Sequence, residues 1–189
     1  MQRKPRQRWL MRFMVMGVMA VAVGMASLVQ AQTTSTGPYY ATPSWDQTLP
    51  SATRFIILSN FSGQAVLDRT TGLVWARGTE GVGDWSAGRV RCLGKKLGGQ
   101  MGWRLPSVVE LSSLVDPTAL RSAEGLPPGH PFSINGTQQN YWSATTNVLN
   151  STEVWVVNFA DATVGTRSTV APDTFQVWCV RSSMNADAY

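Results

Sequence analysis

The side chains that could do chemistry are few, and their spacing does not assemble a catalytic site. The one histidine, His130, lies between Gly129 and Pro131 in a turn-like context. A catalytic histidine needs a nucleophile or an orienting acid, and no Ser, Asp or Cys motif points toward this one. We therefore expect a structural or solvent-exposed histidine and a protein that is not an enzyme. The carboxylates considered are scattered: Asp68, Glu110, Asp116, Glu153 and Asp161.

The two cysteines, Cys92 and Cys179, form the only pair available for a disulfide. In an exported protein such a pair favours a bond, with two buried free thiols as the alternative. The bond would close nearly the whole domain, for which chain-entropy models give about 4–5 kcal/mol as an upper estimate. One His and two Cys are too few for a closed zinc site, so we expect no metal cofactor. A calcium site in the segment 117–140 is a weaker alternative.

The densest basic cluster could bind a polyanion. It consists of Arg89, Arg91, Lys95 and Lys96. These residues fall on the polar side of a predicted helix, where they could attract sulfated or phosphorylated polymers by screened electrostatics. A solvated helix face without a ligand is the alternative interpretation.

The net charge of +5 arises at the N-terminus. Five of the sixteen basic residues lie in the first twelve positions, and the eleven others balance the eleven acidic residues. This balance gives no indication of a nucleic-acid partner.

A signal peptide is predicted at 1–31. Its features are the basic start, an apolar run from Phe13 to about Val29 and the small residue Ala31. We expect export to the periplasm or the extracellular space, with no membrane span after cleavage; an uncleaved anchor is the alternative.

The segment 32–52 is rich in Thr, Ser and Pro, which is typical of a linker or arm. We place one domain at 53–183 and a tail at 184–189. The domain starts with a strand at 54–58 and a hairpin, whose strands at 65–68 and 73–76 flank a four-residue turn. In this turn Asp68 can accept a backbone hydrogen bond, and Gly72 supplies a positive φ.

Two helices are predicted next. Asp84 or Ser86 caps the first helix, which is expected to run to about Leu97 and to stop at Gly98–Gly99. Its apolar stripe would consist of Ala87, Val90, Leu93 and Leu97. Because Cys92 lies off this stripe, we expect its disulfide near the edge of the core.

The segment 102–111 carries the strongest local signal and begins the second helix. Ser107 and Glu110 have the spacing of a capping box, in which each side chain binds the other residue's backbone N–H. Pro106 suits the position before the cap. We interpret the whole motif as structural: Trp103, Arg104, Pro106, Ser107 and Glu110.

The rest of the chain is predicted to be a long irregular loop at 117–140 followed by strands. Strands are expected at 141–145 and 153–159, then a short partner strand, and a final strand at 175–181 with alternating faces. The order of strands, helices, loops and strands predicts an α+β domain with an antiparallel sheet. Five tryptophans are expected in the core rather than as sugar-stacking platforms: Trp75, Trp103, Trp142, Trp155 and Trp178.

Several segments together resemble one bacterial domain family, over about residues 60–182. They are 67–75, Trp85 with Cys92, 102–107 with Glu110-Leu111, 141–145 and 177–181. The family is named after the C-terminal domain of the Legionella collagen-like adhesin and has been catalogued as a domain of unknown function. Trp178 departs from its pattern, which favours a basic or small residue there.

The resemblance implies a C-type-lectin-like fold with long loops, in which a disulfide ties the first helix to the last strand. Cys92 and Cys179 would occupy those two places. It also implies an adhesin-like role, because the family's named member binds sulfated polysaccharides. We expect a secreted or periplasmic binding module for a glycan or a cell-surface protein. The alternative is a structural or oligomerisation domain of the cell envelope without a small ligand.

Overall fold

The computed structural model describes residues 33–35, 49–119, 125–134 and 139–182. The predicted signal peptide at 1–31, most of the predicted linker and the predicted tail at 184–189 lie outside these residues. Within the described part of the chain, no helix is both long and apolar enough to cross a membrane.

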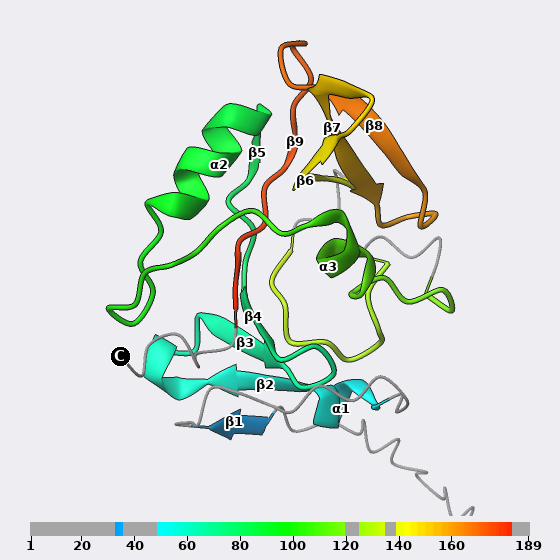
Figure 1. Ribbon diagram of the computed structural model, residues 1–189. Helices are drawn as coiled ribbons and strands as arrows, with labels where there is room; N and C mark the ends of the chain where they lie inside the picture. The colour runs from blue at the N-terminus through cyan, green and yellow to red at the C-terminus, as the bar shows by residue number, and fades with distance from the viewer. Residues whose placement is uncertain (1–32, 36–48, 120–124, 135–138, 183–189) are drawn as a thin grey trace, which may run out of the picture.

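The described residues form mostly β-sheet with a few short helices (Figure 1). The antiparallel pairing and the single disulfide agree with the prediction. The elements in chain order are β1 Thr33–Ser35, α1 Ser51–Arg54, β2 Phe55–Leu58, the 3-10 helix η1 Ser59–Phe61, β3 Ala65–Asp68, β4 Leu73–Ala76, β5 Val82–Gly83, α2 Trp85–Leu93, α3 Val108–Ser112, β6 Asn140–Asn147, β7 Asn150–Asn158, β8 Val164–Ser168, β9 Phe175–Gln176 and β10 Val180–Arg181.

The first sheet has the strand order β1-β2-β3-β4-β10. Its centre is the predicted β3–β4 hairpin, in which Asp68 pairs with Leu73. The Asp68 Oδ1 atom accepts a hydrogen bond from the Thr70 N–H at 3.0 Å, and Gly72 has a φ of 72°. Both turn predictions are therefore confirmed. At the edge of this sheet, β1 pairs in parallel with β2 and lies within the segment interpreted as a linker or arm.

The second sheet has the order β5-β9-β6-β7-β8. Strands β6 and β7 pair antiparallel with a register shift between Trp142 and Thr146, and β8 forms the edge. The strands predicted from 141 and from 153 are thus present. The predicted loop at 117–140 lies between α3 and β6. Its described residues contain no helix, and no strand before Asn140.

The prediction of one continuous strand at 175–181 is wrong. The segment contributes β9 to the second sheet and β10 to the first, and it runs between the two sheets in Figure 1. Backbone hydrogen bonds continue along it, from Val177 N to Gly81 O at 3.0 Å and from Ala76 N to Cys179 O at 2.9 Å. All residues from Gln176 to Arg181 are buried. The alternating pattern therefore does not separate a buried face from an exposed face in this segment.

The prediction for the end and the buried face of the first helix, α2, is also wrong. The predicted N-cap Asp84 does accept a hydrogen bond from Ala87 N, but the helix ends at Leu93 rather than near Leu97. Its buried residues are Gly88 and Cys92. Val90 and Leu93, which we expected in the core, are 69% and 59% exposed.

A small contact residue explains the altered face of α2. A Cβ atom on Gly88 would lie 2.8 Å from Val177 Cγ2, so the helix approaches the 175–181 segment through a glycine. This approach turns Cys92 inward, where it forms the disulfide with Cys179. Both cysteines are fully buried, which corrects the expectation of a bond near the edge of the core.

Aromatic side chains fill the space between the two sheets. Trp178 is fully buried and its ring centroid lies 5.4 Å from Trp75, 5.0 Å from Phe132 and 5.7 Å from Tyr141. Its Nε1–H donates to Ala76 O at 2.7 Å, which satisfies its one polar atom. Four of the five tryptophans expected in the core are buried, while Trp155 is only partly buried.

Candidate functional site

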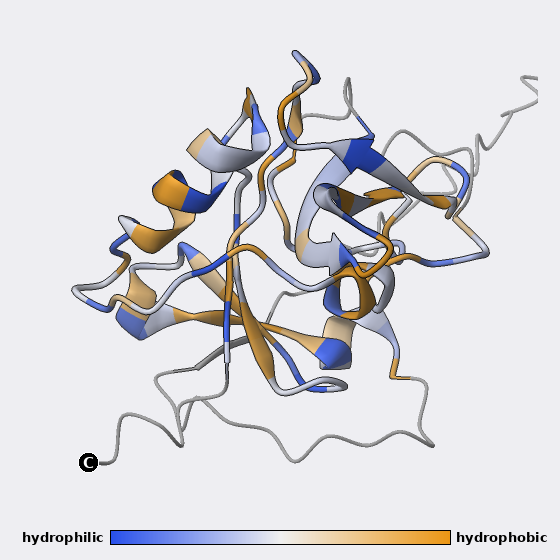
Figure 2. Ribbon diagram, turned by 45° about the horizontal axis from the view of Figure 1, so that its top comes forward, coloured by the Kyte–Doolittle hydropathy of each residue, from blue (hydrophilic) through white to orange (hydrophobic). Residues whose placement is uncertain are grey.

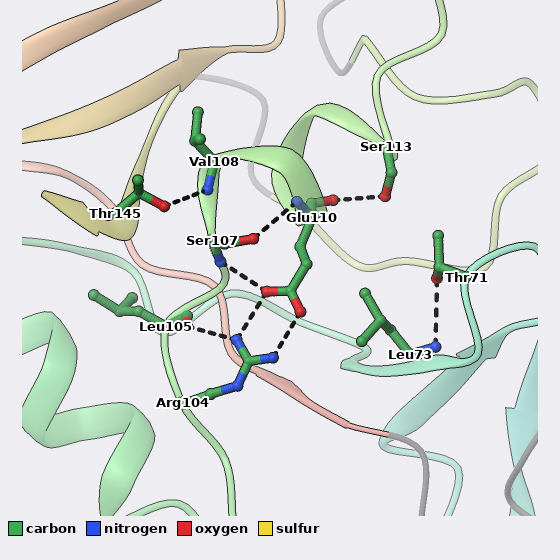
Figure 3. A network of polar contacts seen from close by, with 9 residues as sticks. All are labelled: Thr71, Leu73, Arg104, Leu105, Ser107, Val108, Glu110, Ser113 and Thr145. Atoms are coloured by element: carbon green, nitrogen blue, oxygen red, sulfur yellow. Dashed lines mark hydrogen bonds and ion pairs between the residues drawn. The ribbon is translucent and has the colours of Figure 1, made fainter. Parts of the chain in front are cut away.

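The capping box at the start of α3 is formed as predicted (Figure 3). Glu110 N donates to Ser107 Oγ at 3.2 Å, and Ser107 N donates to Glu110 Oε2 at 2.7 Å. These two bonds satisfy backbone donors that an α-helix leaves without partners at its first turn. Pro106 immediately precedes the cap and is buried.

A second partner of Glu110 was not predicted. The Arg104 guanidinium donates to both carboxylate oxygens, at 2.8 Å from Nη1 and 2.6 Å from Nη2. Burial by itself would raise the pKa of Glu110, but hydrogen bonds from Arg104 and Ser107 outweigh it, so the pKa lies below its ordinary value. No helical or strand spacing relates positions 104 and 110, because a proline turn separates them, and the sequence therefore held no direct signal for the pair.

The same motif is anchored to the C-terminal segment through its backbone. Arg104 and Val180 exchange two backbone hydrogen bonds of 2.9 Å. Trp103 is buried, and its ring meets the Phe61 ring edge-on at a centroid distance of 6.0 Å. These contacts support the structural interpretation of the motif.

The structure does not bring the four predicted basic residues to one point. Lys95 forms an ion pair with Glu80, and the Arg91 guanidinium donates to the backbone oxygens of Glu80 and Val82. Arg89 points elsewhere, with its guanidinium 4.8 Å from the centre of the Trp85 ring. Lys96 is exposed just beyond the end of α2. The four residues therefore do not form one row: Arg89 and Arg91 lie on α2 with different partners, and Lys95 and Lys96 follow the end of the helix.

A groove of about 280 Å³ lies beside Arg89, and we call it the α2–β6 groove. Its lining residues come from α2, the turn before α3 and β6: Arg89, Leu93, Arg104, Leu105, Ser107, Ala144 and Thr145. Thr145 Oγ1 accepts a hydrogen bond from Val108 N at 3.0 Å, which joins β6 to the start of α3. Sequence reasoning missed this groove because its residues come from three separate elements.

A larger pocket of about 410 Å³ lies between the β4–β5 connection and the loop after α2. Its charged lining residues are Arg77, Glu80 and Lys95. Arg77 is engaged in holding the loops, since its Nε donates to Pro131 O at 2.9 Å and its Nη1 to Gly63 O at 3.4 Å. Glu80 and Lys95 form an ion pair with each other, so these two charges of the pocket neutralise one another.

The other titratable residues singled out in the sequence line neither the α2–β6 groove nor the larger pocket. His130 Nδ1 accepts a hydrogen bond from Phe132 N at 3.2 Å, and its ring stacks on the Phe132 ring. Asp68 is fully buried and forms an ion pair with Arg54. In the described part of the chain, no three His, Cys, Asp or Glu side chains are grouped so that they could hold a metal ion.

Comparison with known proteins gives one family. The profile of the Lcl C-terminal domain family matches residues 64–181, which is more than half of the chain. No curated protein matches the chain. The chain therefore belongs to the family of the Legionella collagen-like protein C-terminal domain, as its motifs predicted.

Proposed function

We propose that this member of the Lcl C-terminal domain family is an exported, non-enzymatic binding domain whose ligand is an anionic glycan, such as a sulfated polysaccharide. The ligand would lie along α2. The observation that carries the proposal is a set of exposed cations on and beside this helix: Arg89, Arg91 and Lys96.

These three cations keep their charge available for a ligand. Among the described residues, ion pairs join Lys95 to Glu80 and Arg104 to Glu110, but none joins a carboxylate to Arg89, Arg91 or Lys96. Interactions of exposed charges with one small anion are weak and screened by salt. A polymer with repeated sulfate or carboxylate groups can contact several cations at once, and this gain favours a polyanion over a single small anion.

The attachment of α2 supports its use as a binding surface. The helix is capped by Asp84, approaches Val177 closely through Gly88 and is joined covalently to Cys179. The backbone of a helix held in this way loses little conformational freedom when a ligand binds to the cations on and beside it. Figure 2 shows that the same helix also carries hydrophobic residues, so that it offers apolar contact beside its charges.

The C-type-lectin-like fold is part of the proposal. It is supported by the disulfide between the longest helix and the C-terminal segment and by the long loop region before β6. Export to the periplasm or the extracellular space is proposed from the N-terminal leader, and the buried disulfide is compatible with an oxidising compartment. An experimental structure compared with C-type lectins tests the fold, and N-terminal sequencing of the exported protein tests cleavage after Ala31.

Heparin affinity chromatography tests the binding function. The double variant R91Q/K96Q removes two exposed charges from the α2 region, and R69Q/R167Q removes two exposed charges elsewhere. We expect the first variant to elute from heparin at a clearly lower salt concentration than the wild type, and the second to elute close to the wild type. Equal elution of both variants would contradict a site on α2.

A structural or oligomerisation domain is the second candidate function. It is favoured by exposed apolar side chains in the turn between β6 and β7 and in the loop after β8. Val148 is 95% exposed, Leu149 91% and Val170 83%. An exposed apolar group of this kind is typical of a contact surface. Light scattering of the wild type and of L149S distinguishes the two functions. The structural function would be favoured if the wild type forms a stable oligomer, L149S is a monomer, and the wild type is not retained on heparin.

A further inference from the structure

The α2–β6 groove combines an apolar lining with hydrogen-bond donors. Leu93, Leu105 and Ala144 supply the apolar part. Leu93 is 59% exposed although it lies on α2, so the fold itself does not cover this side chain. The removal of such a surface from water by a ligand is favourable, at about 25 cal/mol for each Å².

The polar groups of the groove are mainly donors. Ser107 Oγ and Thr145 Oγ1 each accept a backbone N–H, so each hydroxyl keeps its own hydrogen for donation. Glu110 contacts two residues that line the groove, Ser107 and Arg104, and both of its carboxylate oxygens are bonded to Arg104. The groove therefore favours a ligand that accepts hydrogen bonds and does not favour a cation or a ligand rich in donors.

Arg89 supplies a charge that the protein does not neutralise. Its guanidinium lies over Trp85, and no carboxylate among the described residues pairs with it. Stacking on an indole ring fixes the plane of a guanidinium and leaves its edge able to bind two oxygens side by side. A carboxylate has the geometry that matches this edge.

We propose that the α2–β6 groove binds a small apolar carboxylate, with the carboxylate on Arg89 and the hydroxyls and the hydrocarbon part against Leu93, Leu105 and Ala144. The groove volume of about 280 Å³ lies just below the range of about 300–1,000 Å³ found for pockets that hold drug-sized ligands. The ligand is thus a small acid with a short alkyl or aryl group, either free or at the end of a longer chain. Arg89 belongs to both proposals, but their tests are independent, because the glycan test changes Arg91 and Lys96 and leaves Arg89 in place.

Chemical-shift titration of the isotope-labelled full chain with 4-methylpentanoate tests the proposal. We expect saturable shifts centred on Leu93, Ala144 and Thr145, and at least tenfold weaker binding of the uncharged analogue 4-methylpentan-1-ol. Acetate, which has the charge but lacks the hydrocarbon part, should cause no saturable shift in the same concentration range. Equal binding of the alcohol, equal binding of acetate, or shifts centred elsewhere would overturn the proposal.

Two surface variants separate the site from general charge effects. R89Q should raise the dissociation constant for 4-methylpentanoate about tenfold, which is the usual effect of losing one charged hydrogen-bond partner. R167Q removes an equal charge from the exposed strand β8 and should leave the constant unchanged. An N-acetylated peptide ending in leucine, with a free or an amidated C-terminus, shows whether a chain end can enter the groove. If R89Q binds as the wild type does, the assignment of Arg89 and with it the proposed site is wrong.

Discussion

Arg104 and Glu110 meet across the turn before α3 through two hydrogen bonds of 2.8 and 2.6 Å. This pairing makes Glu110 a member of two structures at once, the helix cap and an ion pair. It also settles the role of Arg104 at the edge of the α2–β6 groove, because its charge is matched by a carboxylate. Arg89 is therefore the cation of the groove that can serve a ligand.

The first prediction concerns the Glu110 ion pair. E110Q keeps a side chain that can complete the capping box but removes the negative charge. We expect a loss of about 1 kcal/mol at neutral pH, a value that allows for the partial exposure of Arg104. Urea unfolding of both proteins at a series of pH values measures this loss.

The pH dependence of this loss follows from the lowered pKa of Glu110. A carboxyl whose pKa is lower in the folded protein stabilises the fold above its unfolded pKa of about 4.3, and the stabilisation disappears as the pH falls through the folded value. The difference in unfolding free energy between wild type and E110Q should thus be largest near neutral pH and should shrink at acid pH. A difference that stays constant down to pH 2 would contradict the charge interaction.

The second prediction concerns the N-cap itself. S107A removes the oxygen that accepts the Glu110 N–H, and such a change costs about 1 kcal/mol of unfolding free energy. The exposed residue Ser151 provides the control, because S151A should change stability by less than about 0.5 kcal/mol. Chemical denaturation measures both variants, and equal stability of the two would show that the cap is not formed in solution.

Local sequence signals predicted the local structures well. The β3–β4 turn, with Asp68 and Gly72, and the capping box, with Ser107 and Glu110, depend on residues within a few positions of one another. Their geometry is set by short-range hydrogen bonds and by backbone freedom. For this reason they could be identified without knowledge of the rest of the fold.

Predictions that depended on tertiary packing were less successful. The apolar stripe through Val90 and Leu93 suggested the wrong buried face of α2. The helix packs through Gly88, and a pattern of hydrophobic side chains cannot indicate a contact made by a glycine. The 175–181 segment is buried on both faces from Gln176 onward and changes sheet, which an alternating pattern does not encode. The α2–β6 groove joins three elements that only the fold brings together.

The third prediction tests this packing of α2. G88A would place a methyl group 2.8 Å from Val177 Cγ2 and should destabilise the protein by about 1–3 kcal/mol, although alanine is the better helix former. Gly94 is the C-cap residue of the same helix, and its φ of −81° and ψ of −7° are accessible to alanine. G94A should consequently be neutral or slightly stabilising. Thermal unfolding of the two variants should show effects of different sign or clearly different size, and a neutral G88A would contradict the close approach.

The fourth prediction concerns the disulfide. Cys92 and Cys179 are separated by 87 positions and are fully buried. The double variant C92A/C179A should lose about 2–5 kcal/mol of unfolding free energy, since the loop that the bond closes is long. Denaturation of the wild type with and without a reductant provides the comparison. If the double variant loses less than about 1 kcal/mol, the bond does not restrict the unfolded chain as we infer.

The most direct test of the proposed glycan function is the salt dependence of binding to a heparin oligosaccharide. Binding to a polyelectrolyte releases condensed counterions, so the logarithm of the affinity falls linearly with the logarithm of the salt concentration. We predict that R91Q/K96Q binds more weakly than the wild type and with a slope smaller by about 1–2, while R69Q/R167Q keeps the wild-type slope. Equal slopes and affinities for the wild type and R91Q/K96Q would contradict a glycan site on α2.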